Sequence, residues 1–228
     1  MNSRKQNARL AGALYVAMGL PGAFTLVYIP SAFFVRGDAA ATAQRIAASP
    51  MLYRVGVLSE LVSGAFAVWL VMVLYDLFKD VDKTLARVMV GLVLAMVAMG
   101  FATTLVLAAP IVLTGGERYL SAFDKQQLDA LTLGAIGLRN QGIRAVAMYW
   151  GLWLLPLGAL VFRSRFLPRI IGVLVIAAGV SYVITSLTYF FFPQYGGLVA
   201  GLSTAPQAAG EGGFAIWMLI KGVKENAA

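Results

Sequence analysis

The sequence predicts an all-α fold: a polytopic membrane helical bundle with six transmembrane helices and short amphipathic helices in the two outer loops. Hydrophobic residues make up 60% of the 228 residues and charged residues only 12%, against about 25% charged residues in soluble domains. Six apolar runs are each long enough to cross about 30 Å of hydrocarbon as a helix. Because lipid offers no partner for free backbone groups, these spans have to be helical. We expect residues 1–228 to form a single transmembrane domain.

The six predicted spans follow one another along the whole chain. They are Leu10–Val35, Leu52–Phe78, Leu85–Leu113, Leu133–Phe162, Leu167–Phe192 and Thr204–Ile220. Basic residues stand directly before the first span, which is also typical of a cleaved signal peptide. The apolar run is long for a signal peptide, however, and cleavage would remove a span.

The connections between the spans differ in character. Gly37–Pro50 has Asp38 as a candidate N-cap and Pro50 as a stop signal, which predicts a short helix outside the membrane. Thr114–Thr132 contains SAFDKQQLDAL, which predicts a second short amphipathic helix on the same side. The inner links KDVDKT and RSRFLPR are tight, and PQYGGLVAGLSTAP before the sixth span is typical of a turn.

The distribution of basic residues predicts the orientation. In this topology eleven of the 18 lysines and arginines fall on one side: Arg4, Lys5, Arg9, Lys79, Lys83, Arg87, Arg163, Arg165, Arg169, Lys221 and Lys224. Short loops rich in such residues stay in the cytoplasm, so both termini are predicted to be cytoplasmic. The net charge of +8 does not predict nucleic-acid binding, because no basic run is long enough to follow a phosphate backbone. Membrane lipid is the expected partner.

The chain has no cysteine and no histidine. This composition excludes disulfides, thiolate or imidazole metal sites, ordinary haem ligation, and Ser-His or Cys-His catalysis. Carboxylates could still bind a hard cation, but the sequence indicates no particular metal site, cofactor or catalytic residue, and we expect none. An intramembrane enzyme is the least favoured class of function, since carboxylates would have to do all the acid–base work.

Charged residues inside the predicted spans are the strongest functional signal. Glu60 lies in the second span, Glu211 in the sixth, and Arg139 and Arg144 open the fourth. An isolated charge at the bilayer centre costs at least roughly 2.5–3.5 kcal/mol. Pairing opposite charges removes most of this cost, so we predict that Arg144 pairs with Glu60 or Glu211.

Polar neighbours extend this cluster. Asn140 stands four residues before Arg144, and Gln207 stands four residues before Glu211, so each pair shares a helix face. Hydroxyls recur on one face of the fifth span at Tyr182, Thr185, Ser186 and Tyr189. The predicted ligand-binding residues are Glu60, Asn140, Arg144, Tyr182, Ser186, Tyr189, Gln207 and Glu211.

Two functions fit this pattern. The first is an outward-facing polar cavity that binds a small amphipathic or anionic molecule, such as a lipid, for transport or sensing. The alternative is a structural or regulatory membrane subunit without a small-molecule ligand, whose buried ion pairs serve only packing.

Four short stretches resemble a bacterial integral membrane family catalogued as domain-of-unknown-function family 4386. They are RLAGALY near the start, the basic residue before the second span, FLPRIIG before the fifth, and GEGGFAIWMLIKG at the end. The resemblance covers Arg9 to Gly222 and implies a six-span helical fold in a bacterial inner membrane, with no established activity. It also implies acidic residues at the positions of Glu60 and Glu211 and a histidine near the start of the fourth span, where this chain carries arginines instead.

Overall fold

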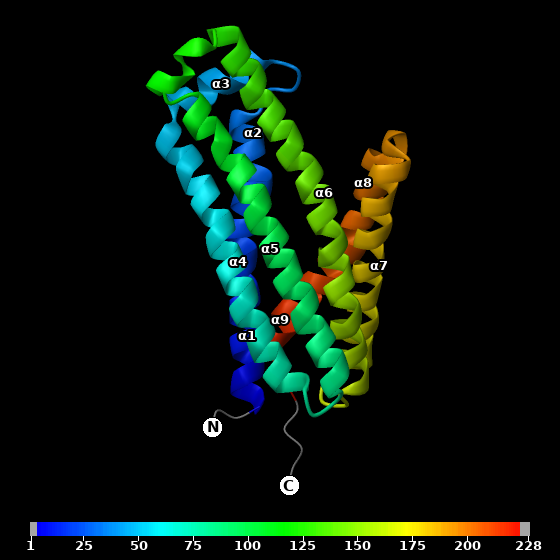
Figure 1. Ribbon diagram of the computed structural model, residues 1–228. Coiled ribbons are helices and arrows are strands. Elements are labelled where there is room, and N and C mark those ends of the chain that lie inside the picture. The colour runs from blue at the N-terminus through cyan, green and yellow to red at the C-terminus, as the bar shows by residue number, and fades with distance from the viewer. Residues whose placement is uncertain (1–3, 224–228) are drawn as a thin grey trace. The chain divides into compact units, whose positions relative to one another are not determined.

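A computed structural model describes residues 4–223, and within that range the regular structure is helical (Figure 1). Lys224, one of the predicted cytoplasmic basic residues, lies outside the described residues. The α-helices are α1 (Arg4–Ala23), α2 (Ile29–Phe33), α3 (Ala39–Ala48), α4 (Pro50–Phe78), α5 (Lys83–Leu113), α6 (Lys125–Arg163), α7 (Arg169–Phe191), α8 (Gly196–Gln207) and α9 (Gly213–Ile220). The shorter turns are the π-helices η1 (Phe24–Tyr28) and η4 (Ala208–Gly212) and the 3₁₀ turns η2 (Arg118–Ala122) and η3 (Pro193–Tyr195).

Within residues 4–223, five helices are long and apolar enough to cross a membrane. They are Arg4–Phe33, Pro50–Phe78, Lys83–Leu113, Lys125–Arg163 and Arg169–Phe191. Each contains most or all of one of the first five predicted spans, so this part of the prediction is confirmed.

The sixth predicted span differs from the structure in its extent. The chain is helical from Gly196 to Ile220, through α8, η4 and α9, so most of the predicted turn before Thr204 is helix. The glycines there do not break the helix, and Pro206 is accommodated inside α8. This run is not among the five apolar helices, and the count of six is not confirmed.

The structure confirms one of the two short helices predicted for the connections and contradicts the other. The first connection contains the predicted short helix α3, and the Asp38 carboxylate accepts a hydrogen bond from the Ala41 N–H at 2.8 Å, as an N-cap does. The prediction of a separate short helix in Thr114–Thr132 was wrong, because residues 125–132 are the first turns of α6. A capping box starts α6: the Asp124 side chain accepts from the Gln127 N–H, and the Gln127 side chain accepts from the Asp124 N–H.

The described chain divides into two compact units. The first unit comprises residues 4–17, 66–97 and 144–223, and the second comprises residues 18–65 and 98–143. The helices α1, α4, α5 and α6 each contribute residues to both units. The single-domain expectation therefore stays a prediction.

Paired glycines bring α6 and α7 together in the first unit. A Cβ on Gly179 would lie 2.8 Å from the Gly151 carbonyl oxygen, and one on Gly172 would lie 2.7 Å from the Gly158 carbonyl oxygen. The two pairs stand seven residues apart on each helix, so they repeat along one contact line. Small residues allow the two backbones to approach this closely. In lipid the hydrophobic effect does not drive helices together, so the close van der Waals packing stabilises the contact.

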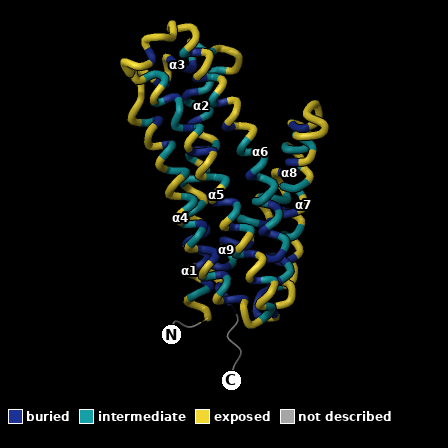
Figure 2. Tube along the Cα trace, viewed as in Figure 1, coloured by how far each residue is buried: buried dark blue, intermediate teal, exposed yellow. Residues whose placement is uncertain are grey.

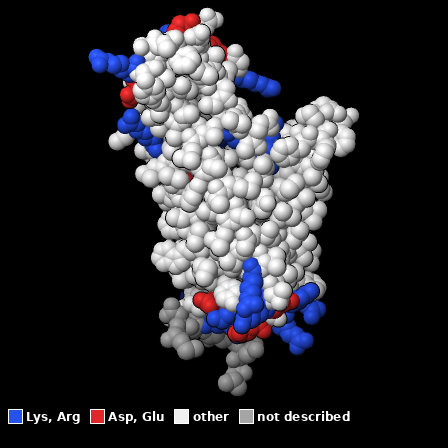
Figure 3. Space-filling view, viewed as in Figure 1, with Lys and Arg blue, Asp and Glu red and all other residues white. Residues whose placement is uncertain are grey.

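Charged side chains gather at one end of the first unit (Figure 3). There the Asp82 carboxylate accepts from the Leu85 N–H at 2.9 Å and pairs with Arg163 at 2.9 Å, which ties the α4–α5 link to the end of α6. The buried Phe166 stacks on Phe78 with ring centroids 5.6 Å apart. The stretch FLPRIIG thus anchors the tight link between α6 and α7.

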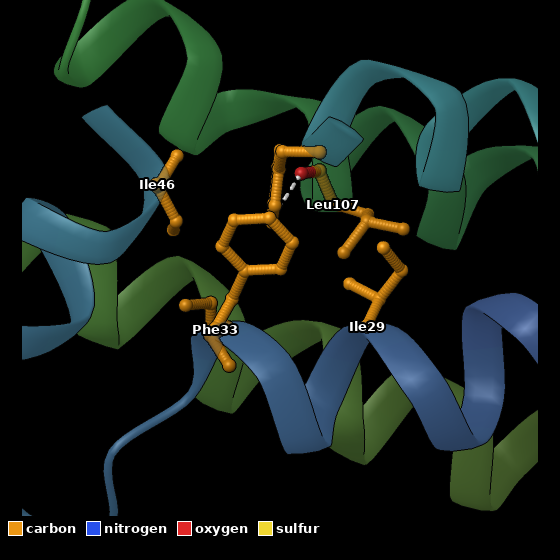
Figure 4. Packing of buried hydrophobic residues seen from close by; sticks show 6 residues of the cluster. Ile29, Phe33, Ile46 and Leu107 are labelled. Carbon is orange, nitrogen blue, oxygen red and sulfur yellow. Dashed lines mark hydrogen bonds between the residues drawn. The ribbon is translucent and has the colours of Figure 1, made fainter. Parts of the chain in front are cut away.

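The second unit has a compact apolar core (Figure 4), made of Ile29, Phe33, Ile46, Tyr53, Leu107 and Ile136. The Tyr53 hydroxyl donates to the Leu107 carbonyl at 2.9 Å, which satisfies its polar atom inside this core. Ile46 comes from α3, so this short helix is fixed by core packing and not only by its cap.

Candidate functional site

Glu211 is held between two tyrosines in the first unit. The Tyr15 hydroxyl donates to Oε2 and the Tyr182 hydroxyl donates to Oε1, both at 2.7 Å. Tyr15 comes from α1, Tyr182 from α7, and Glu211 from the π-helix η4. Both oxygens of one carboxylate therefore join three separate segments.

The local backbone explains how Glu211 reaches this place. Gly210 lies against α7, where a Cβ would stand 2.6 Å from the Ala178 Cβ, so only glycine allows this approach. The π-helical turn widens the backbone by one residue, a feature that frequently occurs at functional sites. The close approach and the widened turn together bring the Glu211 side chain to Tyr182.

Aromatic rings pack against the two tyrosines that hold this carboxylate. The Tyr15 ring lies 6.1 Å from Trp153 and 5.9 Å from Phe214, and the Tyr182 ring meets Trp150 edge-on at 5.8 Å. Tyr15 is only 6% exposed, and the buried residues of α1 and α9 can be followed in Figure 2. The two tyrosines that hold Glu211 are therefore packed among other aromatic rings, and Glu211 itself is half-buried.

Glu211 lies well inside a continuous helical run. That run begins at Gly196, eight residues before the predicted start of the sixth span at Thr204. At 1.5 Å per residue, Glu211 lies about 22 Å from that end and about 14 Å from Ile220.

A second charged centre lies in the second unit. Arg139 on α6 pairs with Glu60 on α4, with 3.3 Å between the nitrogen and the oxygen. The side chain of Arg139 is 3% exposed and that of Glu60 is 14% exposed. The Thr103 hydroxyl of α5, in the same unit, donates to the Gly100 carbonyl at 2.8 Å.

The guanidinium of Arg139 is incompletely satisfied. Its Nε is buried and has no hydrogen-bond partner among the described residues, and the same holds for the Thr132 hydroxyl two turns earlier on α6. A guanidinium carries five N–H donors, whereas the contact with Glu60 uses one nitrogen. Arg139 therefore has donors to spare for another acceptor.

Arg144 takes part in a different set of contacts in the first unit. Its guanidinium carbon lies 4.3 Å from the centroid of the Tyr189 ring, a cation–π distance. Its carbonyl accepts a hydrogen bond from the buried Ser186 hydroxyl at 3.0 Å. The predicted pairing of Arg144 with Glu60 or Glu211 stays a prediction.

The predicted site residues are distributed over both units. Tyr182 and Glu211 are in direct contact in the first unit, and Arg144, Ser186 and Tyr189 form a second group there. Gln207 is half-buried on the same helical run as Glu211. Glu60 and Asn140 belong to the second unit, where Asn140 is exposed and its neighbour Arg139 is buried. A single cavity lined by all eight stays a prediction.

Sequence reasoning missed two important residues as site members. Tyr15 is one tyrosine in an apolar run, and no pattern separates it from a tyrosine at the membrane interface. Arg139 was counted among the charges of the fourth span but was not assigned a partner. Arg139 and Arg144 are five residues apart, so they point about 140° apart around α6, and the sequence does not say which of them faces Glu60.

An open groove of about 660 Å³ lies elsewhere in the second unit. Its lining residues are Leu113, Phe123, Gln127, Ala130, Leu131, Gly134, Ala135 and Leu138. The groove is mostly apolar, and its lining does not include the predicted site residues. Within residues 4–223, no three acidic residues are grouped as a metal site would require.

By their length and composition, the five long apolar helices are those of a multi-pass helical membrane protein. A family model described as "Domain of unknown function (DUF4386)" matches residues 10–222, and the chain belongs to this family. No curated protein and no solved structure matches the chain.

Proposed function

We propose that this protein spans a bacterial inner membrane six times, with both termini in the cytoplasm. In this proposal it binds a small amphipathic molecule with an anionic group, for transport or sensing. The observation that carries the ligand proposal is the buried Arg139, which contacts Glu60 through one nitrogen and keeps an Nε without a partner in the described part of the chain.

The helical run from Gly196 to Ile220 supports a sixth span. Its 25 residues extend about 37 Å, more than the roughly 30 Å of hydrocarbon. With an even number of spans the two termini lie on the same side. The basic residues near the start of α1, at the α4–α5 and α6–α7 links and after α9 favour the cytoplasm as that side.

Burial and charge favour an anionic group as the ligand of Arg139. A guanidinium that is removed from water needs hydrogen-bond acceptors for most of its N–H groups, because each unsatisfied donor raises the free energy of burial. Glu60 supplies one contact. A carboxylate or phosphate suits the remaining donors, because guanidinium binds these groups with two parallel hydrogen bonds.

Depth favours an amphipathic ligand. Arg139 lies 24 residues before Arg163, the charged inner end of α6, which is about 36 Å along the helix. That length exceeds the hydrocarbon core and reaches the layer of lipid headgroups. A molecule with an anionic head and an apolar body would meet Arg139 there.

The alternative function also has an observation in its favour. Glu60 and Arg139 already contact each other, so the pair can hold α4 and α6 together without a ligand. In that case the protein is a structural or regulatory membrane subunit, and ordered water satisfies the Nε of Arg139.

Native mass spectrometry of the full chain released from gentle detergent separates the two functions. We expect wild type to retain a small anionic amphiphile, identified by its fragments as a lipid or another metabolite. Arg139→Met together with Glu60→Gln should abolish this retention and keep thermal stability close to wild type, because neither charge is stranded. Arg54→Met is the matched control, since Arg54 is an exposed arginine of the same unit, and it should retain the molecule. Wild type without a retained molecule, or undiminished retention in the double variant, supports the packing role instead.

A further inference from the structure

We propose that Glu211 is an intramembrane proton-binding site, with Tyr15 and Tyr182 as the partners that respond when the proton binds. This inference goes beyond ligand binding at Arg139, because it concerns the other unit and a different ligand. The geometry on which it rests is the 2.7 Å contact of each Glu211 oxygen with one tyrosine hydroxyl.

The two donors to Glu211 in the described part of the chain are tyrosine hydroxyls, which carry no positive charge. Two phenol hydroxyls stabilise a carboxylate by hydrogen bonding, but they do not neutralise it. The rings of Trp150, Trp153 and Phe214 pack against these two tyrosines, and Glu211 itself is half-buried. Partial removal from water among apolar groups makes a bare charge costly. A proton neutralises this charge and, unlike a metal ion or an organic cation, needs no cavity and no further ligands.

The side chains near Glu211 come from several helices. Tyr15 faces Glu211 from α1 and Tyr182 faces it from α7. The helical neighbours α8 and α9 contribute Gln207 and Phe214, which do not titrate. On α6, Arg144 belongs to the same unit as Glu211. Its guanidinium lies over the Tyr189 ring.

Protonation changes the hydrogen bonds in a defined way. An ionised carboxylate accepts from both tyrosines at once. A proton taken from water and placed on Oε1 turns that oxygen into a donor toward the Tyr182 oxygen, and the Tyr182 hydroxyl hydrogen has to turn to another acceptor. A proton on Oε2 does the same to Tyr15. A single proton therefore reverses the hydrogen bond that joins η4 to α7 or to α1.

Infrared spectroscopy of the full chain in lipid nanodiscs, titrated over about pH 4 to 10, tests the site. We expect a protonated-carboxyl band that appears as the pH falls and is missing in Glu211→Gln. Glu117→Gln replaces an exposed glutamate and should keep that band. A Glu211→Gln spectrum identical to wild type across the titration would overturn the proposal.

A second variant keeps the test decisive if Glu211→Gln fails to fold. The double change Tyr15→Phe and Tyr182→Phe retains Glu211 and removes both donors to its ionised form. The protonated-carboxyl band should then persist to a higher pH than in wild type. An unchanged titration in this variant would show that the tyrosines do not respond to the proton, which also overturns the proposal.

Discussion

At the scale of single residues, the charged side chains of α6 each have a specific contact, and that contact depends on where the residue stands around the helix. Arg139 and Arg144 stand close together in the sequence, yet one pairs with a carboxylate and the other lies over a tyrosine ring. The presence of charges inside the spans was predictable from composition and position. The choice between the two arginines was not, since it depends on the rotation of α6 within the fold.

Arg165 provides a prediction at this scale. It is the non-glycine residue with a positive φ, 59°, in the described chain, a conformation that costs roughly 1–2 kcal/mol for most residues. We expect Arg165→Gly to leave thermal stability unchanged or to raise it by up to about 1 kcal/mol. Arg165→Val should lower stability, because a branched Cβ fits this region worst. Both variants remove the same charge, so equal melting temperatures for the two would contradict the prediction.

At the scale of elements, hydropathy predicts the long apolar helices, and local signals predict where some of them start. The Asp38 cap of α3 was predictable from the residue type and its place before a helical run. The joining of residues 125–132 to α6 was not, because the capping box at Asp124 and Gln127 lies inside a polar stretch that also suits a separate helix. The π-helical turn around Glu211 has no sequence pattern that distinguishes it from ordinary helix.

The glycine contacts between α6 and α7 lead to a prediction about these elements. Gly172→Ala places a Cβ 2.7 Å from the Gly158 carbonyl oxygen and 2.8 Å from the Phe162 nitrogen, both backbone atoms that cannot move aside. We expect overpacking to cost about 1–3 kcal/mol, visible as a lower melting temperature in detergent.

The control for this prediction is Gly91→Ala in α5, in the same unit, where a Cβ meets nothing within 4 Å. Alanine favours helix over glycine by roughly 1 kcal/mol, so this variant should melt at the same temperature as wild type or higher. A Gly172→Ala protein as stable as Gly91→Ala would mean that α6 and α7 do not rely on these glycines.

At the scale of the whole molecule, the proposed topology can be tested directly because the chain has no native cysteine. Single cysteines at Asp82 and at Ser121 stand in connections at opposite ends of α5. In intact cells a membrane-impermeant maleimide should label the cysteine at Ser121 from outside, and it should label the cysteine at Asp82 only after the membrane is opened. Equal labelling of both from outside would refute the proposed arrangement of the spans.

Because α6 is longer than a bilayer is thick, its first turns should be accessible to a binding protein outside the cell. Its 39 residues form a rod of about 58 Å, whereas a bilayer with its headgroups is about 40–45 Å thick. An average tilt of about 20° shortens the projected rod only slightly, so roughly the first two turns of α6 should stand clear of the lipid. In the proposed orientation these turns form a helical epitope. An antibody fragment raised against them would bind the same helix that carries Arg139.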